Sequence, residues 1–471
     1  MKKFLLKLSP LFAAVFLFFA CSNNVEKTNG GWETINDILK NIKQPTFADN
    51  EYNILDFGAK LDSTFNSKPA IQLAIDKCSE NGGGTVLIPS GIYFSAGSIF
   101  LKSNVNLHLQ DGAKINFSTS SKDYLPVVLS RWEGIECYNY SALIYAKDQE
   151  NIAITGNGIF NGKASAENWW PWKGKTEYGF VKGMPSQLDS MGRPRLLKMN
   201  LEQMPAEERI FGEGFYLRPN FFQTINCKNI LIEGVTFKDS PMWFLHPVLS
   251  ENITIRGVTV IGNGPNNDGC DPESCKNVLI ENCNFNTGDD CIAIKSGRNN
   301  DGRRINVPSE NFIIRNCKMK DGHGGVVIGS EISGGCKNIF AENCEMDSPN
   351  LDRAIRIKTN AIRGGTIENI YARNISVGEV KEAILKINLN YEPNEIGERN
   401  FPPTVKNIFI ENVISKKSEY AFYLDGLEES KINNVQIVNS KLDGVNNGNV
   451  LNNIENFKTN DVYINEKLFK N

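Results

Sequence analysis

An asparagine followed by an apolar residue recurs at short intervals along most of this chain, and that repeat restricts the folds open to it. The pair occurs at Asn151-Ile152, Asn229-Ile230, Asn252-Ile253, Asn277-Val278, Asn311-Phe312, Asn338-Ile339, Asn369-Ile370 and Asn407-Ile408. From Asn229 onward, successive asparagines are 23, 25, 34, 27, 31 and 38 residues apart. Such a period is typical of solenoids, in which each repeat forms one coil and packs only against its neighbours.

The residues that follow each asparagine indicate that the coils are built from strands. Short alternating runs such as Ile230-Leu231-Ile232 and Ile253-Thr254-Ile255 are typical of strands rather than helices. We therefore predict an all-β, single-stranded right-handed parallel β-helix, in which the turns on one side absorb the irregular spacing. Leucine-rich repeat and propeller folds agree less well with this irregular spacing. Because a solenoid lengthens without dividing its core, we expect one domain over residues 50–471.

Cysteines keep the same register as the asparagines. One set lies six residues after a repeat asparagine: Cys283, Cys317 and Cys344. A second set lies two residues before one: Cys227, Cys275 and Cys336. Equivalent positions in neighbouring coils stack about 4.8 Å apart, so we expect short columns of buried thiols. Disulfides are the alternative, but stacked side chains point in parallel and the eleven cysteines show no framework spacing.

Four polar clusters fall at matching points of successive repeats. They are Asn266-Asn267-Asp268, Gly288-Asp289-Asp290, Gly322-His323-Gly324 and Arg356-Ile357-Lys358. Each alone is an ordinary turn or a solvated strand. A shared phase, however, brings all four to one surface patch about 15 Å tall, at about 4.8 Å for each coil.

Alignment of the repeats assigns each cluster to a coil. The run Gly288–Ile294 matches Gly322–Ile328 at an offset of 34, the same as the spacing of the two asparagines in those coils. His323 is therefore predicted one coil beyond Asp289, facing the same way. Asp268 falls in the coil before, and the match of Ile357-Lys358 with Ile294-Lys295 puts Arg356 in the coil after.

Three carboxylates with a histidine and two cations favour glycoside hydrolysis. That reaction needs a protonated carboxyl to protonate the leaving oxygen and an ionised one to activate water or attack the sugar. Crowding supplies both forms, because mutual repulsion raises the pKa of at least one carboxyl. Arg356 and Lys358 alternate along one strand, so they face the same way and suit the carboxylate of a sugar acid. The substrate class this predicts is a polyuronide.

The four clusters, in this order, resemble the signature of glycoside hydrolase family 28, the polygalacturonase family, which folds as a pectin-lyase-like β-helix. The resemblance implies an inverting hydrolase with Asp289 as general acid, Asp268 and Asp290 activating water, and His323 supporting the acid. The residues assigned to substrate binding are Asn266, Lys295, Arg356 and Lys358. The family's usual threonine is replaced by Asn267. Because the Gly-His-Gly turn is retained, the resemblance favours galacturonan over rhamnogalacturonan, with xylogalacturonan as an alternative.

A 78-residue interval between Asn151 and Asn229 is far longer than one coil needs and predicts a protruding flap. It contains sugar-stacking and uronate-pairing residue types, namely Trp169, Trp170, Trp172, Arg193, Arg195 and Lys198. The alternative is a structural flap whose tryptophans pack on the cylinder. A flap closing one end of the groove would make the enzyme exo-acting. The segment Gly297–Arg304 also resembles exo-acting family members, so we favour exo action.

The N-terminus resembles a bacterial lipoprotein signal. Lysines flank the start of an apolar run over residues 8–20 that is too short to span a bilayer, and Cys21 follows it. We predict a signal peptide over residues 1–20, lipidation of Cys21, and a tether over residues 21–49. The protein would then be exported and held on a bacterial membrane by lipid alone; ordinary signal cleavage is the alternative.

Beyond the tether, a helix is predicted over Ser67–Glu80, where Ile71, Ala74, Ile75 and Cys78 share one face. Such a helix suits the open end of a solenoid, whose exposed core needs a cap. The last 25 or so residues are expected to cap the other end.

The net charge of −3 gives no support to nucleic-acid binding. The predicted partner is a galacturonate-containing polysaccharide or oligosaccharide, with no cofactor or metal, and a monomer is expected. Three alternatives remain open: a polysaccharide lyase, a glycan-binding β-helix without activity, and a structural metal site built from Asp268, Asp289, Asp290 and His323.

Overall fold

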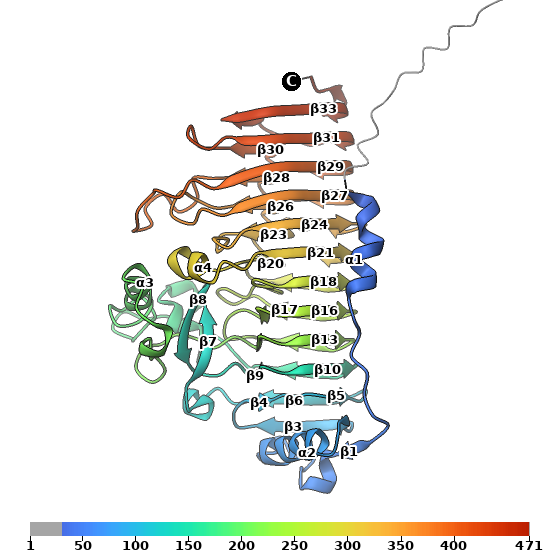
Figure 1. Cartoon of the computed structure of the whole chain (residues 1–471), viewed down its shortest axis with the longest axis vertical. Helices are drawn as coiled ribbons and strands as arrows, with labels where there is room; N and C mark the ends of the chain where they lie inside the picture. Colours follow the sequence, from blue (N-terminus) through green and yellow to red (C-terminus); the bar gives the residue numbers. More distant parts are fainter. Residues whose placement is uncertain (1–30, 471) are drawn as a thin grey trace, which may run out of the picture.

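The computed structural model describes residues 31–470, and these form a parallel β-helix (Figure 1). Three sheets run along the cylinder, and successive coils pair in parallel in each. The first sheet contains β1 (Glu51–Asn53), β2 (Gly84–Ile88), β5 (Val105–Leu109), β10 (Glu150–Gly156), β13 (Lys228–Glu233), β16 (Glu251–Arg256), β18 (Lys276–Glu281), β21 (Ser309–Arg315), β24 (Cys336–Glu342), β27 (Thr366–Glu379), β29 (Thr404–Lys417), β31 (Ile432–Leu442) and β33 (Ile454–Ile464). The predicted architecture is confirmed.

Two further sheets complete each coil. The second contains β3 (Gly91–Ser95), β6 (Ala113–Phe117), β11 (Ile159–Asn161), β14 (Thr236–Lys238), β17 (Thr259–Gly262), β19 (Asn284–Thr287), β22 (Lys318–Met319) and β25 (Glu345–Met346), and it merges with the first along β27, β29, β31 and β33. The third contains β4 (Ile99–Phe100), β9 (Ile144–Lys147), β12 (Phe222–Ile225), β15 (Leu245–Val248), β20 (Ile292–Ile294), β23 (Val326–Gly329), β26 (Arg353–Lys358), β28 (Ala383–Asn388), β30 (Tyr420–Asp425) and β32 (Val450–Asn452). Single bridges through Cys270 join β15 to β20.

The repeat asparagines form a continuous hydrogen-bonded ladder near the start of the strands in the first sheet. Nδ2 of Asn277 donates to Oδ1 of Asn252 over 3.2 Å, and Asn311 donates likewise to Asn277 over 3.1 Å. The same bond links all neighbours in the series Asn104, Asn151, Asn229, Asn252, Asn277, Asn311, Asn338, Asn369, Asn407 and Asn434. Each has a positive φ, which asparagine tolerates better than most residues, and its amide both donates and accepts.

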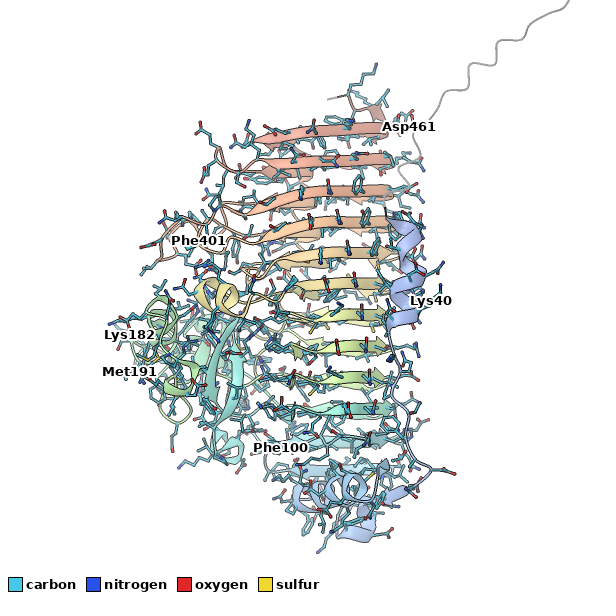
Figure 2. The ribbon with its side chains drawn as sticks, viewed as in Figure 1. Lys40, Phe100, Lys182, Met191, Phe401 and Asp461 are labelled. Carbon is cyan, nitrogen blue, oxygen red and sulfur yellow. The ribbon has the colours of Figure 1, made fainter. Side chains whose placement is uncertain are left out.

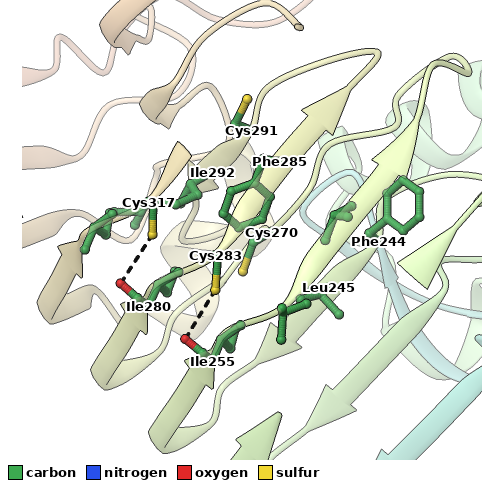
Figure 3. Close-up of a cluster of buried hydrophobic side chains, with 14 of the residues drawn as sticks. Phe244, Leu245, Ile255, Cys270, Ile280, Cys283, Phe285, Cys291, Ile292 and Cys317 are labelled. Carbon is green, nitrogen blue, oxygen red and sulfur yellow. Dashed lines mark hydrogen bonds between the residues drawn. The ribbon is translucent and has the colours of Figure 1, made fainter. Parts of the chain in front are cut away.

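Thiols fill part of the core between the sheets, as predicted. Cys283, Cys317 and Cys344 are buried one above another, and Cys283 and Cys317 donate Sγ–H to carbonyls of the preceding coil (Figure 3). All ten cysteines of the described chain are buried and unpaired by disulfides. The second predicted column differs in one respect, because its cysteines alternate with serines. The order along that column is Cys227, Ser250, Cys275, Ser309 and Cys336.

Both ends of the cylinder are capped. Helix α2 (Lys68–Glu80) covers the first coil with the predicted apolar face, and Ile71, Ala74, Ile75 and Cys78 are fully buried. At the other end, β33 turns back into the antiparallel strand β34 (Lys467–Leu468), and Phe469 packs on Phe422. Both caps cover apolar coil ends that water would otherwise reach.

The tether predicted over residues 21–49 is wrong for its second half. Helix α1 (Ile35–Asn41) lies along the outside of the first sheet (Figure 1), and Ile35 and Ile38 are buried against Leu279 and Ile313. Trp32, just before this helix, packs edge-on against outward-facing aromatic rings of β24 and β27. The apolar face of α1 packs on apolar residues that point outward from the first sheet. A solenoid needs apolar residues only on the inside, so the repeat did not predict this contact.

The predicted signal peptide and Cys21 lie outside the described residues and stay predictions. Within residues 31–470, no helix combines the length and apolarity needed to cross a bilayer.

Long insertions leave the cylinder at the third sheet. One carries the antiparallel hairpin β7 (Val128–Trp132) and β8 (Ile135–Asn139); another, residues 162–219, is the predicted flap and contains α3 (Arg193–Leu201). Helix α4 (Asn299–Ile305) follows β20, and residues 390–403, here called the distal loop, follow β28. Hairpin, flap and α4 stand together on one side of the cylinder (Figure 1), with Lys182 and Met191 at the outer edge of the flap (Figure 2).

The ladder gives a test of the fold. We expect Asn311→Ala to destabilise the protein by ~2–4 kcal/mol, because it removes two amide hydrogen bonds and puts a Cβ-bearing residue of low αL preference at φ +63°. Asn311→Gly keeps the backbone relaxed and should lose only about half of that. Thermal unfolding monitored by circular dichroism measures both. Equal melting temperatures for wild type and Asn311→Ala would contradict a stabilising ladder.

Candidate active site

The coils bring the four polar clusters together in the predicted register. Ile292 pairs with Val326, and Val327 pairs with Arg356, so the Asp-Asp, Gly-His-Gly and Arg-Ile-Lys segments occupy successive coils. Cys270 bridges to Ile292, which puts the Asn-Asn-Asp segment in the coil before. The first three clusters lie just before strands or bridges of the third sheet, and the Arg-Ile-Lys cluster forms the end of β26.

Three carboxylates form the centre of the site. One oxygen each from Asp268, Asp289 and Asp290 lies within 4.8 Å of the others. Asp290 is fully buried and forms ion pairs with Lys358, whose Nζ is 2.7 Å away, and with Arg356 at 3.5 Å. The cationic pair predicted to hold a substrate carboxylate is therefore also the counter-charge that stabilises Asp290 in the interior.

His323 and Asp289 form a hydrogen-bonded pair at 2.8 Å between Nδ1 and Oδ1. Burial alone would raise the pKa of Asp289, but the bond from His323 and the positive charges of His323, Lys358 and Lys173 hold it well below its usual range. The same bond raises the pKa of His323 above 6.5. Below the raised pKa of His323 the pair therefore carries one proton, and the imidazole ring holds it.

A fourth carboxylate, Asp271, was missed by the sequence reasoning. It is fully buried, and Nζ of Lys295 lies 3.4 Å from Asp271, 3.8 Å from Asp268 and 3.2 Å from Glu331. Burial raises the pKa of Asp271 to about 8; burial and the charges of Asp271 and Asp289 raise that of Asp268 well above its usual range. A raised carboxyl pKa was predicted for the cluster and is confirmed at Asp268. The only indication in the sequence that Asp271 belongs to the site was its position three residues after Asp268.

The remaining predicted binding residues line the same cavity. Asn266 accepts hydrogen bonds at Oδ1 from Lys173 and Arg218, while Lys295 is almost fully buried among its carboxylates. Asn267, which departs from the family motif, faces away from the cavity: its buried amide accepts from the backbone of Gly264 and donates to two backbone carbonyls. Its role is to shape the turn that carries Asp268.

The flap covers this site, but not with the residues predicted to contact sugar. Trp169 is buried in the core, Trp170 donates to the carbonyl of Ser240, and Trp172 packs against Trp169. The alternative, a structural flap whose tryptophans pack on the cylinder, is therefore confirmed.

The basic residues of the flap divide in the same way. Arg195 lies over the rings of Phe211 and Phe215, and Lys198 is exposed beside Glu202, outside the cavity. Arg193 does line the cavity and is ion-paired with Glu133 of the hairpin. Lys173, Lys175 and Tyr178 also reach the cavity and were not singled out from the sequence.

A buried arginine joins the walls of the cavity. Arg298, between β20 and α4, is 2% exposed and ion-paired with Glu133 of the hairpin, Glu331 beyond β23, and Glu392 and Glu395 of the distal loop. Arg298 belongs to the segment Gly297–Arg304, which resembles exo-acting family members in sequence. Its charge is neutralised by four carboxylates, and these ion pairs hold the insertions together.

The resulting cavity has a volume of about 610 Å³, within the range of ligand-binding pockets. Hairpin, flap and distal loop wall it on one side. A second hollow of about 480 Å³ adjoins it at His323 and Asp352. Its lining comes from the end of β19, at Thr287, and from turns of the cylinder, namely Asn263, Gly288, Asp321, Gly322, His323, Pro349, Asn350, Asp352 and Lys381. The site is thus enclosed on the side of the insertions and continues without cover on the other.

Comparison with known proteins identifies the family. The profile described as Glycosyl hydrolases family 28 matches residues 213–462, and one described as Rhamnogalacturonase A/epimerase, pectate lyase-like, matches residues 52–118. A hyperthermoactive exopolygalacturonase from Thermotoga maritima is 44% identical, with a TM-score of 0.89 over 93% of this chain and 97% of that one. This chain belongs to glycosyl hydrolase family 28. The resemblance found in the sequence is confirmed.

More distant relatives extend this family 28 comparison. A probable polygalacturonase from Vitis vinifera is 28% identical over 82% of this chain and 73% of its own length. An exo-poly-alpha-D-galacturonosidase from Dickeya chrysanthemi is 28% identical over 83% of this chain and 67% of its own length. The family 28 exopolygalacturonase of Yersinia enterocolitica shares the fold, with a TM-score of 0.68 at 22% identity over 88% of this chain and 76% of that one. The protein is a glycoside hydrolase.

The His323–Asp289 pair predicts the alkaline limb of the pH profile. The proton on His323 is present below its raised pKa and is lost as the pH rises through it, so kcat should fall there. We expect His323→Gln to lower kcat by about 100-fold or more and to remove that limb, because glutamine cannot hold the proton. His108→Gln is the matched control, since His108 bonds Thr155 away from the site. An unchanged alkaline limb in His323→Gln would contradict this role.

Proposed function

We propose that this family 28 enzyme hydrolyses α-1,4-galacturonosidic bonds of homogalacturonan, or of its oligosaccharides, from a chain end and with inversion. The observation that carries the proposal is the set of three carboxylates with Arg356 and Lys358 inside a cavity enclosed on one side. The names of the relatives support the substrate, and two of the similar structures are of exo-acting enzymes.

The residues divide the reaction into two proton transfers. Asp290, ion-paired on both oxygens, acts with Asp268 as the base that takes a proton from water as it attacks the anomeric carbon. Asp289 gives a proton to the leaving glycosidic oxygen. His323, 2.8 Å from Asp289, is the store from which that proton comes. The sugar carboxylate binds near Arg356 and Lys358, whose cationic groups suit it.

Exo action follows from the shape of the cavity. A chain end enters the cavity as far as the insertions allow, and the rest of the polymer leaves along the uncovered hollow lined by turns of the cylinder. The Arg298 ion pairs keep the hairpin and the distal loop in place, so the enclosed side does not open for a continuous polymer. Each cleavage then releases a short product of fixed size.

Product analysis tests the proposal. On polygalacturonic acid we expect saturated monomer from the first time points, with no ladder of oligomers. Asp289→Asn should lower kcat by at least about 10³-fold, because it removes the general acid. Asp37→Asn, an exposed carboxylate on α1, is the control and should leave kcat unchanged. The measurement is reducing ends, ultraviolet absorbance and product sizes in the same reaction. A ladder of oligomers would contradict exo action.

Two alternative functions give different products. A lyase forms an unsaturated product that absorbs ultraviolet light, and a binding module forms no product at all.

A structural metal at the three carboxylates is the remaining alternative. Lys295, Arg356 and Lys358 already lie among these carboxylates and supply the positive charge that an ion would bring. We therefore expect full activity after exhaustive treatment with a chelator. Activity lost in chelator and restored by a divalent cation would contradict the absence of an essential metal.

A further inference from the structure

Two cations at the enclosed side of the cavity form no ion pair within the described chain. Nζ of Lys173, from the flap, donates to Oδ1 of Asn266 over 2.7 Å, and Nη2 of Arg218 donates to the same oxygen over 2.8 Å. Arg218 is fully buried, and its other bonds go to Gln187 and to the carbonyls of Pro241 and Pro265. Two positive charges therefore converge on one neutral amide.

Lys173 differs in this respect from the other cations of the cavity. The rest are ion-paired within the protein: Lys175, Arg193, Lys295, Arg298, Arg353, Arg356 and Lys358. Lys173 is attracted by Glu133 and Asp289 from a distance, but Glu133 is already paired with two arginines and Asp289 with His323. An uncompensated charge in a partly buried site is costly, and an anionic ligand removes that cost.

We propose that Lys173, with the amide nitrogen of Asn266, binds the carboxylate of the chain-terminal uronate. This inference rests on the proposed function and adds a second carboxylate site to the one at Arg356 and Lys358. Arg218 acts as a positioning residue: it fixes the amide oxygen of Asn266, so that the NH₂ group is left to donate, and its charge strengthens that donor.

The site gives the insertion a chemical role beyond blocking the cavity. Because Lys173 belongs to the flap, it is present only where the chain end arrives. A terminal sugar with an ionised carboxylate gains a charge-assisted hydrogen bond there, whereas a methyl-esterified or neutral terminal sugar leaves the lysine without a counter-ion. The flap thereby selects the ionised end of the polymer.

The ionisation of Lys173 adds a pH signature. Burial and the nearby charge of Arg218 lower the pKa of Lys173 to about 8. The lysine is cationic below that pH and neutral above it, so binding of the terminal carboxylate weakens as pH rises through about 8. Glu133, Asp289 and Arg193 also act on Lys173, and they come from the hairpin, the third-sheet turn and α3. A bound carboxylate moves the pKa of Lys173 upward.

The test compares Lys173→Met with two controls on trigalacturonate. We expect KM to rise about 10- to 100-fold in Lys173→Met, with a smaller change in kcat, which is the usual range for one charge-assisted hydrogen bond. Lys173→Arg should retain most of the affinity and shift the alkaline rise in KM to higher pH. Lys198→Met removes an exposed lysine of the same flap and should match wild type. An unchanged KM in Lys173→Met would overturn the proposal.

A second substrate separates charge recognition from damage to the flap. The substrate is trigalacturonate esterified at its terminal carboxylate. For wild type, esterification should lower the affinity by as much as Lys173→Met lowers it on the free acid. For Lys173→Met, esterification should cause little further loss. If Lys173→Met binds the free acid and the ester more weakly than wild type by the same factor, Lys173 has a structural role and the inference is overturned.

Failure of the proposed function would be visible separately. If wild type cleaves no galacturonan, direct binding still tests the site, through tryptophan fluorescence titrated with galacturonate and, as the neutral probe, galactose. Trp170 and Trp172 come just before Lys173 in the sequence and report on it. Quenching by galacturonate alone, absent in Lys173→Met, supports the carboxylate site; equal responses of both proteins overturn it.

Discussion

Hydrogen bonding between coils in fixed register is the interaction on which the active site depends. Each repeat asparagine is bonded to the asparagine before and after it, so a coil that slips relative to both neighbours breaks two amide bonds. A slip of one residue would also turn apolar side chains outward and polar ones inward. Residues far apart in sequence, such as Asp290 and Arg356, therefore come into contact at a spacing set by the sheet.

That same spacing forces like charges together. Asp268 and Asp290 lie one coil apart because the backbone puts them there, and their repulsion is offset by cations from the following coils. The site is therefore a balance of buried charges in which each acid differs: Asp290 is ion-paired, Asp289 shares a proton with His323, and Asp268 has a raised pKa. Acid–base catalysis requires that carboxyl groups of the same chemical type have different pKa values, so that one can give a proton while another accepts one.

Features with a regular spacing, either in the repeat or on one face of a helix, could be predicted from sequence, and the side-chain contacts of the irregular insertions could not. The offset of 34 residues located His323 beside Asp289 because both belong to the periodic part of the chain. Helix α2 was predictable from one-face spacing. The flap has no period, so the sequence left open whether Trp169 contacts sugar or packs on the cylinder, and it did not indicate that Lys173 reaches the cavity.

Other failures came from burial and from pairing across the structure. The sequence around Arg298 gave no sign of its partners, but four glutamates from distant segments surround it. The segment before residue 50 is polar enough for a tether, yet α1 packs on outward-facing apolar residues of the first sheet. In both cases the deciding partner lies elsewhere in the chain, where composition alone gives no signal.

The stereochemistry of the first product distinguishes inversion from retention at this site. Carboxylates within 4.8 Å are closer than the roughly 6.5–9.5 Å usual for inverting hydrolases, so the distance by itself would favour a covalent intermediate. In the proposed mechanism, Asp268 and Asp290 instead activate a water molecule that attacks the anomeric carbon. Proton NMR of the anomeric signals in the first minutes of hydrolysis distinguishes the two mechanisms. The account predicts the β anomer from the α-linked substrate; initial release of the α anomer would contradict it.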